Sequence, residues 1–366
     1  MEHVTVLGAG AAGLAVAAQL KARGVDCVVL ERGPGVGTSW RGRYDRLHLH
    51  TIRRLSGLPG FPIPRAYGRW VRRDDLVRYL EAYAEHFGID VRTGATVEKV
   101  KPGWSVHLAD GSELPARTVI VATGYLHTPV VPAWPGREEW SGKLIHSAEY
   151  RNAEPFRGQN VLVVGPGNSG SEIATDLAEG GAASVSLAIR TPPHIVRRDK
   201  FGWPAQMNGV LLGRLPEKAF NPMAAAMSRL EMPDLRRYGI ARPTEGLKTR
   251  LRTHRYVPVQ DVGIVRDVIA GRVRPVAAVE SFTETSVRLA DGTSVQPDTI
   301  IAATGYGTGL PEMFDDPTLF DDTGVPRVNG GAPARPGLYF LGYDVTLGGM
   351  LRQAAIESRA VARAIA

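Results

Sequence analysis

The sequence predicts an α/β fold made of two related units, each with a parallel sheet and a β-hairpin. The first observation is a repeat, because Val106–Tyr125 returns as Val287–Tyr306. The second is a pair of glycine-rich loops, GAGAAG at Gly8–Gly13 and GPGNSG at Gly165–Gly170, each directly after an apolar stretch. The third is the alternation of strands with helices, which is typical of a doubly wound parallel sheet. Because a glycine-rich loop is followed by the repeated segment in both halves of the chain, the chain contains two copies of one architecture.

The expected elements follow the same order in both units. The first unit should have strands over Thr5–Leu7, Cys27–Leu30, 89–92 and 118–122, with helices over Ala11–Lys21 and near 74–87. The second should have strands over 160–164 and 185–189 around a helix over 169–179. Each repeated segment carries an Asp-Gly pair between alternating residues, which is a strong signal for a hairpin turn.

We expect two domains, the first formed by 1–152 and 297–366 and the second by 153–296. The first is discontinuous because the tail after Tyr306 has the pattern of a strand, a glycine turn and a closing helix, which should return to the first sheet. Around 192–256 the alternation breaks down into Pro- and Met-containing helical fragments. This stretch is predicted to be a helical insertion in the second domain, which either shapes a cavity or caps the domain.

Composition excludes several classes of protein. The 366 residues are 43% hydrophobic and 22% charged, which is typical of a globular chain and argues against disorder. No apolar run approaches the roughly 18 residues of a membrane helix, and no signal peptide is evident, so we expect a cytoplasmic protein without membrane contact. The net charge of +7 comes from scattered basic residues rather than a stripe, which argues against nucleic acid as a partner.

The first glycine loop has the pattern of a dinucleotide-binding site. Gly8 permits a tight turn, Gly10 lets the backbone approach a pyrophosphate, and Gly13 allows close packing of helix on strand. The helix that follows presents unpaired N–H groups and a positive dipole end to the phosphates. Glu31 ends the next strand 31 − 13 = 18 residues after Gly13, where an acid binds ribose hydroxyls.

The second loop, with Gly165, Gly167 and Gly170, repeats this context with one change. Its second strand is followed by Arg190 instead of an acid. A guanidinium pairs with a 2′-phosphate that a carboxylate would repel, so the second site is predicted to take NADP(H) rather than NAD(H). Arg190 as a solvated surface charge is the alternative. Ser169 either contacts the pyrophosphate or caps the helix.

Two such sites in one chain predict FAD and NADPH, with hydride passing from nicotinamide to flavin. The only cysteine, Cys27, cannot form a C-x-x-C pair, and within VDCVVLE it is expected to be a small buried hydrophobe. Oxygen is therefore the expected electron acceptor, with a protein partner as the alternative. No His, Cys, Asp or Glu cluster has the spacing of metal ligands.

A resemblance to a known family supports this interpretation. WSGKLIHSAEYR at Trp140–Arg151 resembles the F-x-G-x-x-x-H-x-x-x-(Y/F/W) fingerprint of class B flavoprotein monooxygenases, with Trp in place of the first Phe, and its Tyr-Arg ending resembles the flavin-containing monooxygenase branch. GVGTSW at Gly35–Trp40 and ATGY at Ala303–Tyr306 are similar to further motifs of the family. The segments Thr38–Pro64 and Pro258–Val276 are most similar to the YUCCA-type group, and the likeness is weakest in the insertion.

The resemblance implies an FAD- and NADPH-dependent monooxygenase that uses a flavin C4a-(hydro)peroxide. Its partners would be O2 and a small 2-oxo acid such as indole-3-pyruvate, which would undergo oxidative decarboxylation. N- or S-oxygenation of a small amine or thioether is the alternative within the class. A flavin-dependent NADPH reductase that serves a protein partner is the alternative outside it. The sequence carries no signal for an oligomeric state.

Several single residues receive expected roles from this resemblance. His50 stands where many heteroatom-oxidising relatives carry Asn, and it is the candidate catalytic residue or else a packing histidine. Trp40 stacks near the flavin or packs in the core, His146 ties the linker to NADP(H) or holds linker geometry, and Asp344 contacts the flavin or caps a turn. The glycine loops and the resemblance together predict as cofactor-binding positions Gly8, Gly10, Ala12, Gly13, Glu31, Arg32, Ser39, Trp40, Leu49, His50, Val97, Thr123, Gly124, Gly165, Gly167, Asn168, Ser169, Gly170, Arg190, Thr304, Gly305, Gly342 and Asp344.

Overall fold

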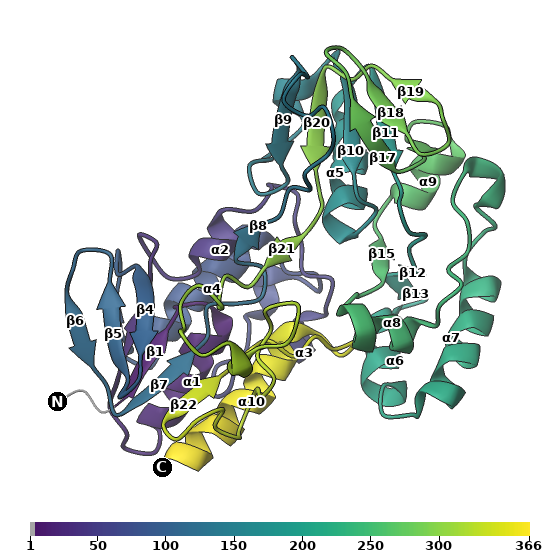
Figure 1. The fold of residues 1–366 in the computed structure, drawn as a ribbon. Coiled ribbons are helices and arrows are strands. Elements are labelled where there is room, and N and C mark those ends of the chain that lie inside the picture. The colour runs from purple at the N-terminus through teal and green to yellow at the C-terminus, as the bar shows by residue number, and fades with distance from the viewer. Residues whose placement is uncertain (1–3) are drawn as a thin grey trace. The chain divides into compact units, whose positions relative to one another are not determined.

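The computed structural model describes residues 4–366, and the chain divides into two compact units (Figure 1). Unit 1 comprises the chain up to Gly42, Leu47–Thr128 and Tyr306–Ala366, and unit 2 comprises Arg43–Arg46 and Pro129–Gly305. The predicted boundaries at 152/153 and 296/297 therefore differ from those of the structure. The difference arises because strand β9 (Lys143–His146) pairs with β20 (Thr299–Ala302), which places both in unit 2.

Unit 1 is built on a five-stranded parallel sheet. Its order is β22-β7-β1-β2-β3, with β1 at Val4–Leu7, β2 at Cys27–Leu30, β3 at Asp90–Arg92, β7 at Thr118–Val121 and β22 at Leu338–Phe340. Helices α1 (Ala11–Lys21), α4 (Arg73–His86) and α10 (Met350–Ile365) cover one face (Figure 1). The antiparallel sheet of β4 (Val97–Lys101), β5 (Ser105–Leu108) and β6 (Glu113–Pro115) packs into a second core, on the opposite face of the parallel sheet.

Side-chain alternation explains why the central strands of unit 1 are apolar throughout. Val6 packs into the core beneath α1, whereas its neighbour Leu7 packs into the core on the opposite face. The same division separates Ile120 from Val121. Because successive residues of a strand point to opposite faces, a sheet covered on both sides needs a continuous apolar run.

Unit 2 repeats this plan. Its parallel sheet has the order β16-β11-β10-β20-β9, with β10 at Asn160–Val164, β11 at Ser184–Ala188 and β16 at Arg274–Val276. Helix α5 (Asn168–Gly180) follows the second glycine loop and contacts α9 (Ile264–Ile269). The antiparallel strands β17 (Val279–Phe282), β18 (Val287–Leu289) and β19 (Ser294–Val295) complete the unit. The predicted fold class, two Rossmann-like units each with a parallel sheet and a hairpin or meander, is confirmed.

The region from 192 to 256 combines helices with short strands. It contains α6 (Ala205–Leu212), α7 (Glu217–Glu231), α8 (Leu247–His254) and the hairpin of β13 (Asp199–Lys200) and β14 (Trp203–Pro204). Strand β12 (Ile195–Arg197) pairs in parallel with β15 (Val259–Asp261) where the region begins and ends. The remaining short elements are α2 (Thr38–Arg41), α3 (Arg53–Ser56), β8 (Thr128–Pro129), β21 (Tyr306–Gly307) and four 3-10 turns at Arg65–Tyr67, Glu154–Phe156, Arg236–Tyr238 and Pro317–Leu319.

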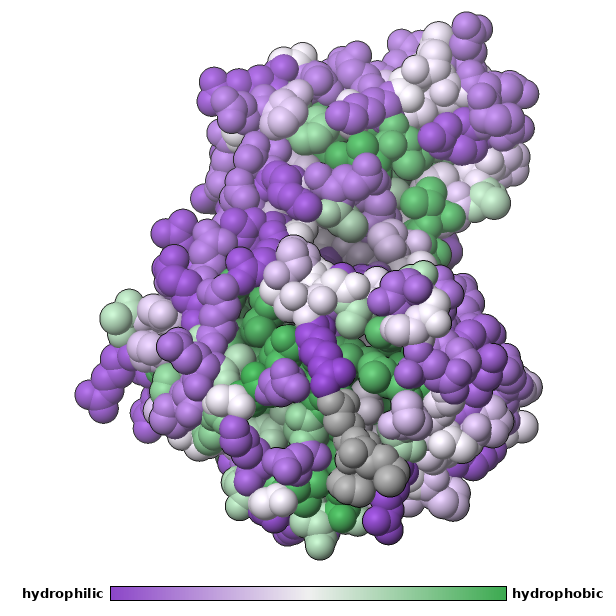
Figure 2. Space-filling view, turned by 90° about the vertical axis from the view of Figure 1, so that its left-hand side faces the viewer, coloured by the Kyte–Doolittle hydropathy of each residue, from purple (hydrophilic) through white to green (hydrophobic). Residues whose placement is uncertain are grey.

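The polarity of the surface agrees with the composition of the chain. On the face shown in Figure 2, hydrophilic residues predominate and apolar residues show between them. Within residues 4–366, no helix is both long and apolar enough to cross a bilayer.

Candidate functional site

The first glycine loop joins β1 to α1, and its three glycines differ in what surrounds them. A Cβ on Gly8, whose φ is 103°, would lie 2.7 Å from the carbonyl oxygen of Ala122. A Cβ on Gly13 would lie only 1.9 Å from the carbonyl oxygen of Gly8. A Cβ on Gly10, by contrast, would meet nothing within 4 Å. The fold therefore requires the outer glycines, and the middle glycine leaves open space in front of the first turn of α1.

The second loop reproduces this geometry between β10 and α5. Gly165 has a φ of 109°, and its Cβ would lie 2.5 Å from the carbonyl oxygen of Ala303. A Cβ on Gly170 would lie 1.9 Å from the carbonyl oxygen of Gly165, whereas one on Gly167 would again meet nothing within 4 Å. Since open backbone at a helix N-terminus suits a phosphate, both loops fit a dinucleotide pyrophosphate.

Glu31 is the acid predicted to bind ribose, and the structure places it at the end of β2 beside the first loop. The side chain is buried, and its two oxygens accept the N–H groups of Ala9 at 2.9 Å and Gly33 at 2.8 Å. The carboxylate thus braces the glycine loop from the neighbouring strand. Each oxygen has two lone pairs, so these bonds leave acceptor capacity for ribose hydroxyls. The adjacent Arg32 is exposed.

At the second loop, the positions predicted around the helix start are tied to other segments of unit 2. The Asn168 side chain donates to the carbonyl of Pro258 at 3.1 Å and accepts from the N–H of Gln260 at 2.8 Å. It therefore fastens the 258–260 segment beside the loop. Ser169 hydrogen-bonds with the phenol of Tyr44, and burial raises the pKa of that phenol. Arg190 is exposed and lies two residues beyond the end of β11.

The segment Arg43–Arg46, which we name the anchor segment, was not predicted from the sequence. It follows α2 in the chain, yet it belongs to unit 2. Arg46 forms ion pairs with Asp176 at 3.2 Å and Glu179 at 2.9 Å, both on α5. The Tyr44 ring lies edge-on to Tyr150, with 6.4 Å between ring centroids. Within unit 2, the anchor segment is thus fastened to the helix that follows the second glycine loop.

The fingerprint Trp140–Arg151 has structural contacts at each of its defining positions. Trp140 packs edge-on against Phe282 in the core of unit 2. A Cβ on Gly142 would lie 2.3 Å from the Trp140 ring, so that ring requires glycine two residues later. The Tyr150 hydroxyl donates to Asp176 at 2.6 Å. The conformation of the linker before the second loop therefore depends on these residues.

His146 in the fingerprint is held as a neutral imidazole. Its Nδ1 accepts the N–H of Ala148 at 3.1 Å, so the proton lies on Nε2, which donates to the carbonyl of Gly305 at 3.1 Å. Burial lowers the pKa of His146, which agrees with a neutral ring. These bonds join the end of β9 to the ATGY segment after β20, and they agree with the expected role in linker geometry.

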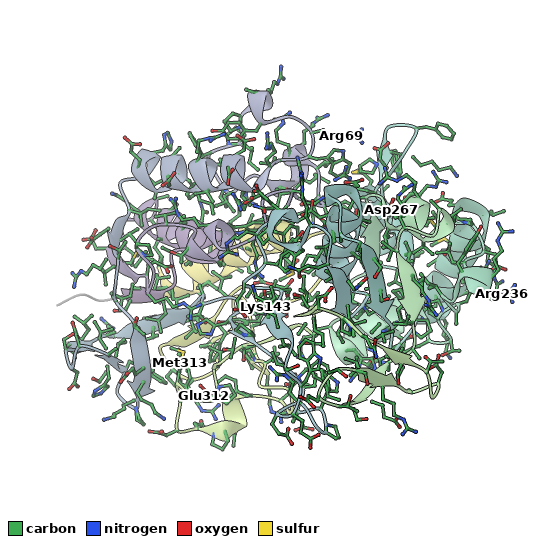
Figure 3. The ribbon with its side chains drawn as sticks, turned by 90° about the horizontal axis from the view of Figure 1, so that it is seen from above. Arg69, Lys143, Arg236, Asp267, Glu312 and Met313 are labelled. Atoms are coloured by element: carbon green, nitrogen blue, oxygen red, sulfur yellow. The ribbon has the colours of Figure 1, made fainter. Side chains whose placement is uncertain are left out.

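An ion-pair network holds the 258–276 motif against α5. Asp267, labelled in Figure 3, is completely buried and pairs with Arg272 and with Arg266. Burial alone would raise the pKa of Asp267, but hydrogen bonds from both arginines hold it below its usual value. Arg266 also pairs with Glu179, which in turn pairs with Arg46 of the anchor segment.

In unit 1, the third stretch of predicted positions gathers at the carboxyl ends of β7 and β22. The Thr123 hydroxyl hydrogen-bonds with that of Tyr343 at 2.9 Å. A Cβ on Gly342 would lie 3.0 Å from the Cβ of Ala12, so this turn closely approaches the start of α1. The N–H of Gly342 donates to Glu357 on α10 at 2.9 Å. Sequence reasoning missed Glu357, although an acid on the buried face of the last helix could have indicated it.

The other predicted positions vary in exposure. Gly124 and Gly305 both have positive φ, at 85° and 94°. Trp40 packs partly buried against the core beneath α1, Leu49 is buried in the same core, and Val97 packs against the core on the opposite face. His50, Thr123 and Thr304 are half-buried, while Ser39 and Asp344 are exposed. Their contacts with a cofactor remain predictions.

The lone cysteine has no feature of a redox site. Burial raises the pKa of the Cys27 thiol to about 11, so at neutral pH it stays protonated and is a poor nucleophile. Among residues 4–366, no group of three His, Cys, Asp or Glu side chains could hold a metal ion.

Comparison with known proteins places this architecture in a family. The profile of the family FMO-like, described as flavin-binding monooxygenase-like, matches residues 1–366. The indole-3-pyruvate monooxygenase YUCCA1 of Oryza sativa subsp. japonica is 38% identical over 92% of this chain and 86% of its own. A flavin-containing monooxygenase from Stenotrophomonas maltophilia is 26% identical with a TM-score of 0.75, covering 100% of this chain and 99% of that one.

A further solved structure supports the fold alone. An oxidised steroid monooxygenase with bound NADP has a TM-score of 0.76 at 21% identity, over 99% of this chain and 85% of its own. The resemblance inferred from the motifs is confirmed by these matches. The chain belongs to the flavin-binding monooxygenase-like family and is a flavoprotein monooxygenase.

Proposed function

We propose that the protein is an FAD- and NADPH-dependent monooxygenase that acts on a small aromatic 2-oxo acid such as indole-3-pyruvate. The observation that carries the cofactor pair is the doubled loop geometry, in which the middle glycine of each loop faces open space. Glu31 after the first loop favours a ribose with free hydroxyls, and Arg190 after the second favours a 2′-phosphate. The first loop would hold FAD and the second NADPH.

The residues of the chain would hold and orient the cofactors. The N–H groups of the first turns of α1 and α5 would bind the two pyrophosphates. Glu31 would keep the first loop in shape while it accepts ribose hydroxyls, and Asn168 would keep the 258–260 segment beside the second loop. When bound, the flavin supplies the redox chemistry, taking hydride from NADPH and activating O2.

The substrate class rests on the similarity to indole-3-pyruvate monooxygenases, which extends over nearly the whole chain. The balanced reaction would convert a 2-oxo acid, O2, NADPH and a proton into the carboxylic acid shorter by one carbon, CO2, NADP+ and water. One oxygen atom would enter the product acid and the other would leave as water. His50 is the candidate residue for a hydrogen bond at the reacting centre.

The test is product analysis with the purified holoenzyme, NADPH and O2. Indole-3-pyruvate, an aryl methyl thioether and a tertiary amine would be supplied separately, with O2 uptake and product mass recorded. We expect substrate-dependent O2 uptake and indole-3-acetate with one equivalent of CO2. A sulfoxide or N-oxide as the only product would overturn the 2-oxo acid assignment. NADPH oxidation that yields hydrogen peroxide regardless of substrate would overturn the oxygenase itself.

A further inference from the structure

The positive charge of the chain is concentrated in the helical insertion. Residues 192–256 contain 13 Lys and Arg against 5 Asp and Glu, a net charge of +8. The whole chain has 44 and 37, which leaves 31 basic and 32 acidic residues elsewhere, a net charge of −1. The excess of basic residues is therefore not evenly scattered, contrary to the expectation above, because the whole of the +7 lies in one region of unit 2. Such a field attracts a polyanionic partner.

The hairpin of β13 and β14 presents an aromatic side chain at its tip. Its register leaves a two-residue turn of Phe201 and Gly202, with φ values of 50° and 81°. Turns of this kind strongly prefer Asn, Asp or Gly at the first position, and an aromatic residue there is strained. Phe201 is nevertheless 99% exposed. A fully exposed Phe gains no burial energy that would offset this strain.

Further apolar side chains lie near this tip. Trp203, across the turn, is 49% exposed, and Leu230 near the end of α7 is 86% exposed. An ion pair of 3.1 Å between Lys200 and Glu231 joins the residue before Phe201 to the residue after Leu230. The hairpin and the end of α7 therefore lie close together. We name Phe201, Trp203 and Leu230 the apolar tip.

Exposed basic side chains accompany the apolar tip within the insertion. Lys200 on β13 precedes Phe201, Arg229 precedes Leu230 on α7, and Arg197 at the end of β12 donates to the carbonyl of Glu231 at 3.0 Å. Arg214 and Lys218 lie before and at the start of α7, and Arg236 lies at the periphery in Figure 3. Aromatic and aliphatic groups combined with Lys and Arg are the composition of surfaces that enter the headgroup region of a bilayer. A nucleic acid would match the charge and stack on the aromatics, but it has no use for an exposed leucine. A second copy related by a two-fold axis would bring like charges together.

We propose that the apolar tip and the basic residues around it form a peripheral docking surface for a membrane rich in anionic lipid. The aromatic and leucine side chains insert at the level of the headgroups, and the arginine and lysine side chains pair with lipid phosphates. This surface shares no residue with the two glycine loops. It requires no membrane-spanning helix, and it departs from the expectation of a protein without membrane contact.

Phe201→Asn provides a sharp test, because asparagine suits the positive φ of the turn and removes the apolar group. The full holoenzyme would be sedimented with vesicles of phosphatidylcholine alone and of phosphatidylcholine with phosphatidylglycerol, at low and high salt. We expect binding to the anionic vesicles, weakened by salt, and at least about tenfold weaker for Phe201→Asn, as removal of a Phe side chain from an apolar phase implies. Its Tm should equal or exceed that of the parent.

Matched controls distinguish vesicle binding by the apolar tip from non-specific vesicle binding by other exposed side chains. Ile269→Asn removes another exposed apolar side chain of unit 2, and it should leave vesicle binding unchanged. The pair Lys218→Gln and Arg229→Gln should weaken binding more than the same change at Arg117 and Arg157, two exposed arginines outside the insertion.

Several outcomes would overturn the proposal. One is equal binding to both kinds of vesicle, or none to either. Another is anionic-vesicle binding that Phe201→Asn leaves intact. Concentration-dependent dimers that dissociate in Phe201→Asn would assign the tip to a second copy. A change in the KM for NADPH or substrate without any lipid effect would assign it to the catalytic cycle instead.

Discussion

Replacing the middle and last glycines of the first loop by alanine should have opposite consequences. A methyl group on Gly10 meets nothing within 4 Å, and φ there is −83°, which alanine readily adopts. Gly10→Ala should therefore fold with a free energy of unfolding within about 1 kcal/mol of the parent. The same methyl group would occupy the space proposed for the pyrophosphate. We thus expect a folded protein that purifies with little or no flavin.

Gly13→Ala adds the same single carbon at a place where the chain has no room. The new Cβ would lie 1.9 Å from the carbonyl oxygen of Gly8, so a separation of 3.0 Å requires a shift of 3.0 − 1.9 = 1.1 Å between helix and loop. Moving α1 that far disturbs a packed core, at a cost of about 3 kcal/mol or more. The protein should lose stability in the absence of cofactor, and flavin loss should follow as a consequence.

The assay compares the two variants with the parent, first as apoproteins and then with added FAD. Denaturant unfolding of the apoproteins gives stability, and the change in flavin fluorescence on titration gives affinity. Gly167→Ala and Gly170→Ala provide the same comparison in the second loop, with NADPH as ligand. The reasoning is refuted if Gly10→Ala binds FAD with the parent's affinity, or if apo Gly13→Ala is as stable as apo Gly10→Ala.

Three further predictions concern single side chains. Arg190→Ala should raise the KM for NADPH by roughly tenfold or more with little change in the KM for NADH, because it removes a charge-assisted contact to the 2′-phosphate. Equal changes in the two KM values, measured by steady-state kinetics, would show that Arg190 does not contact the 2′-phosphate. Arg46→Met should destabilise the protein by about 1 kcal/mol in denaturant unfolding, since Arg46 and Asp176 are partly buried while Glu179 is exposed. The exposed Arg23→Met is its control and should change stability little. The pKa of His146 lies below its ordinary 6.5 in the folded chain, so its stabilising contribution is present above pH 6.5 and is lost as the pH falls. The stability gap between parent and His146→Asn should accordingly narrow on acidification, and a gap independent of pH would contradict the neutral imidazole.

Local patterns explain why the geometry of the glycine loops could be predicted. Gly8, Gly10 and Gly13 lie within six consecutive residues between a strand and a helix. The close approach of Gly13 to Gly8 arises within this short unit, whereas that of Gly8 to Ala122 involves the end of the neighbouring strand β7. Glu31 was predicted from its distance along the chain, because a helix and the next strand bring it back beside the loop. The structure adds that one of its oxygens accepts the N–H of Ala9 in the loop and the other accepts the N–H of Gly33 after its own strand.

Long-range contacts explain what could not be predicted. Arg46 and Asp176 are 130 residues apart, and Asn168 and Gln260 are 92 apart. No spacing rule connects such pairs, since they meet only after two separate segments have folded. For the same reason the division of the chain at Thr128 and Gly305 differed from the expected boundaries, because the pairing of β9 with β20 is a tertiary event.

The sequence by itself determined the repeated α/β plan, the two glycine loops at the starts of α1 and α5, and the positions of the acid and the arginine that follow them. These features follow from short-range sterics and from the alternation of side chains along strands. Only the tertiary structure decided that the anchor segment joins the unit with the second loop, that the fingerprint braces that unit, and that a strained Phe201 projects from the basic insertion. Each of these depends on which distant side chains become neighbours and which are left exposed, and burial and packing decide that only in the folded chain.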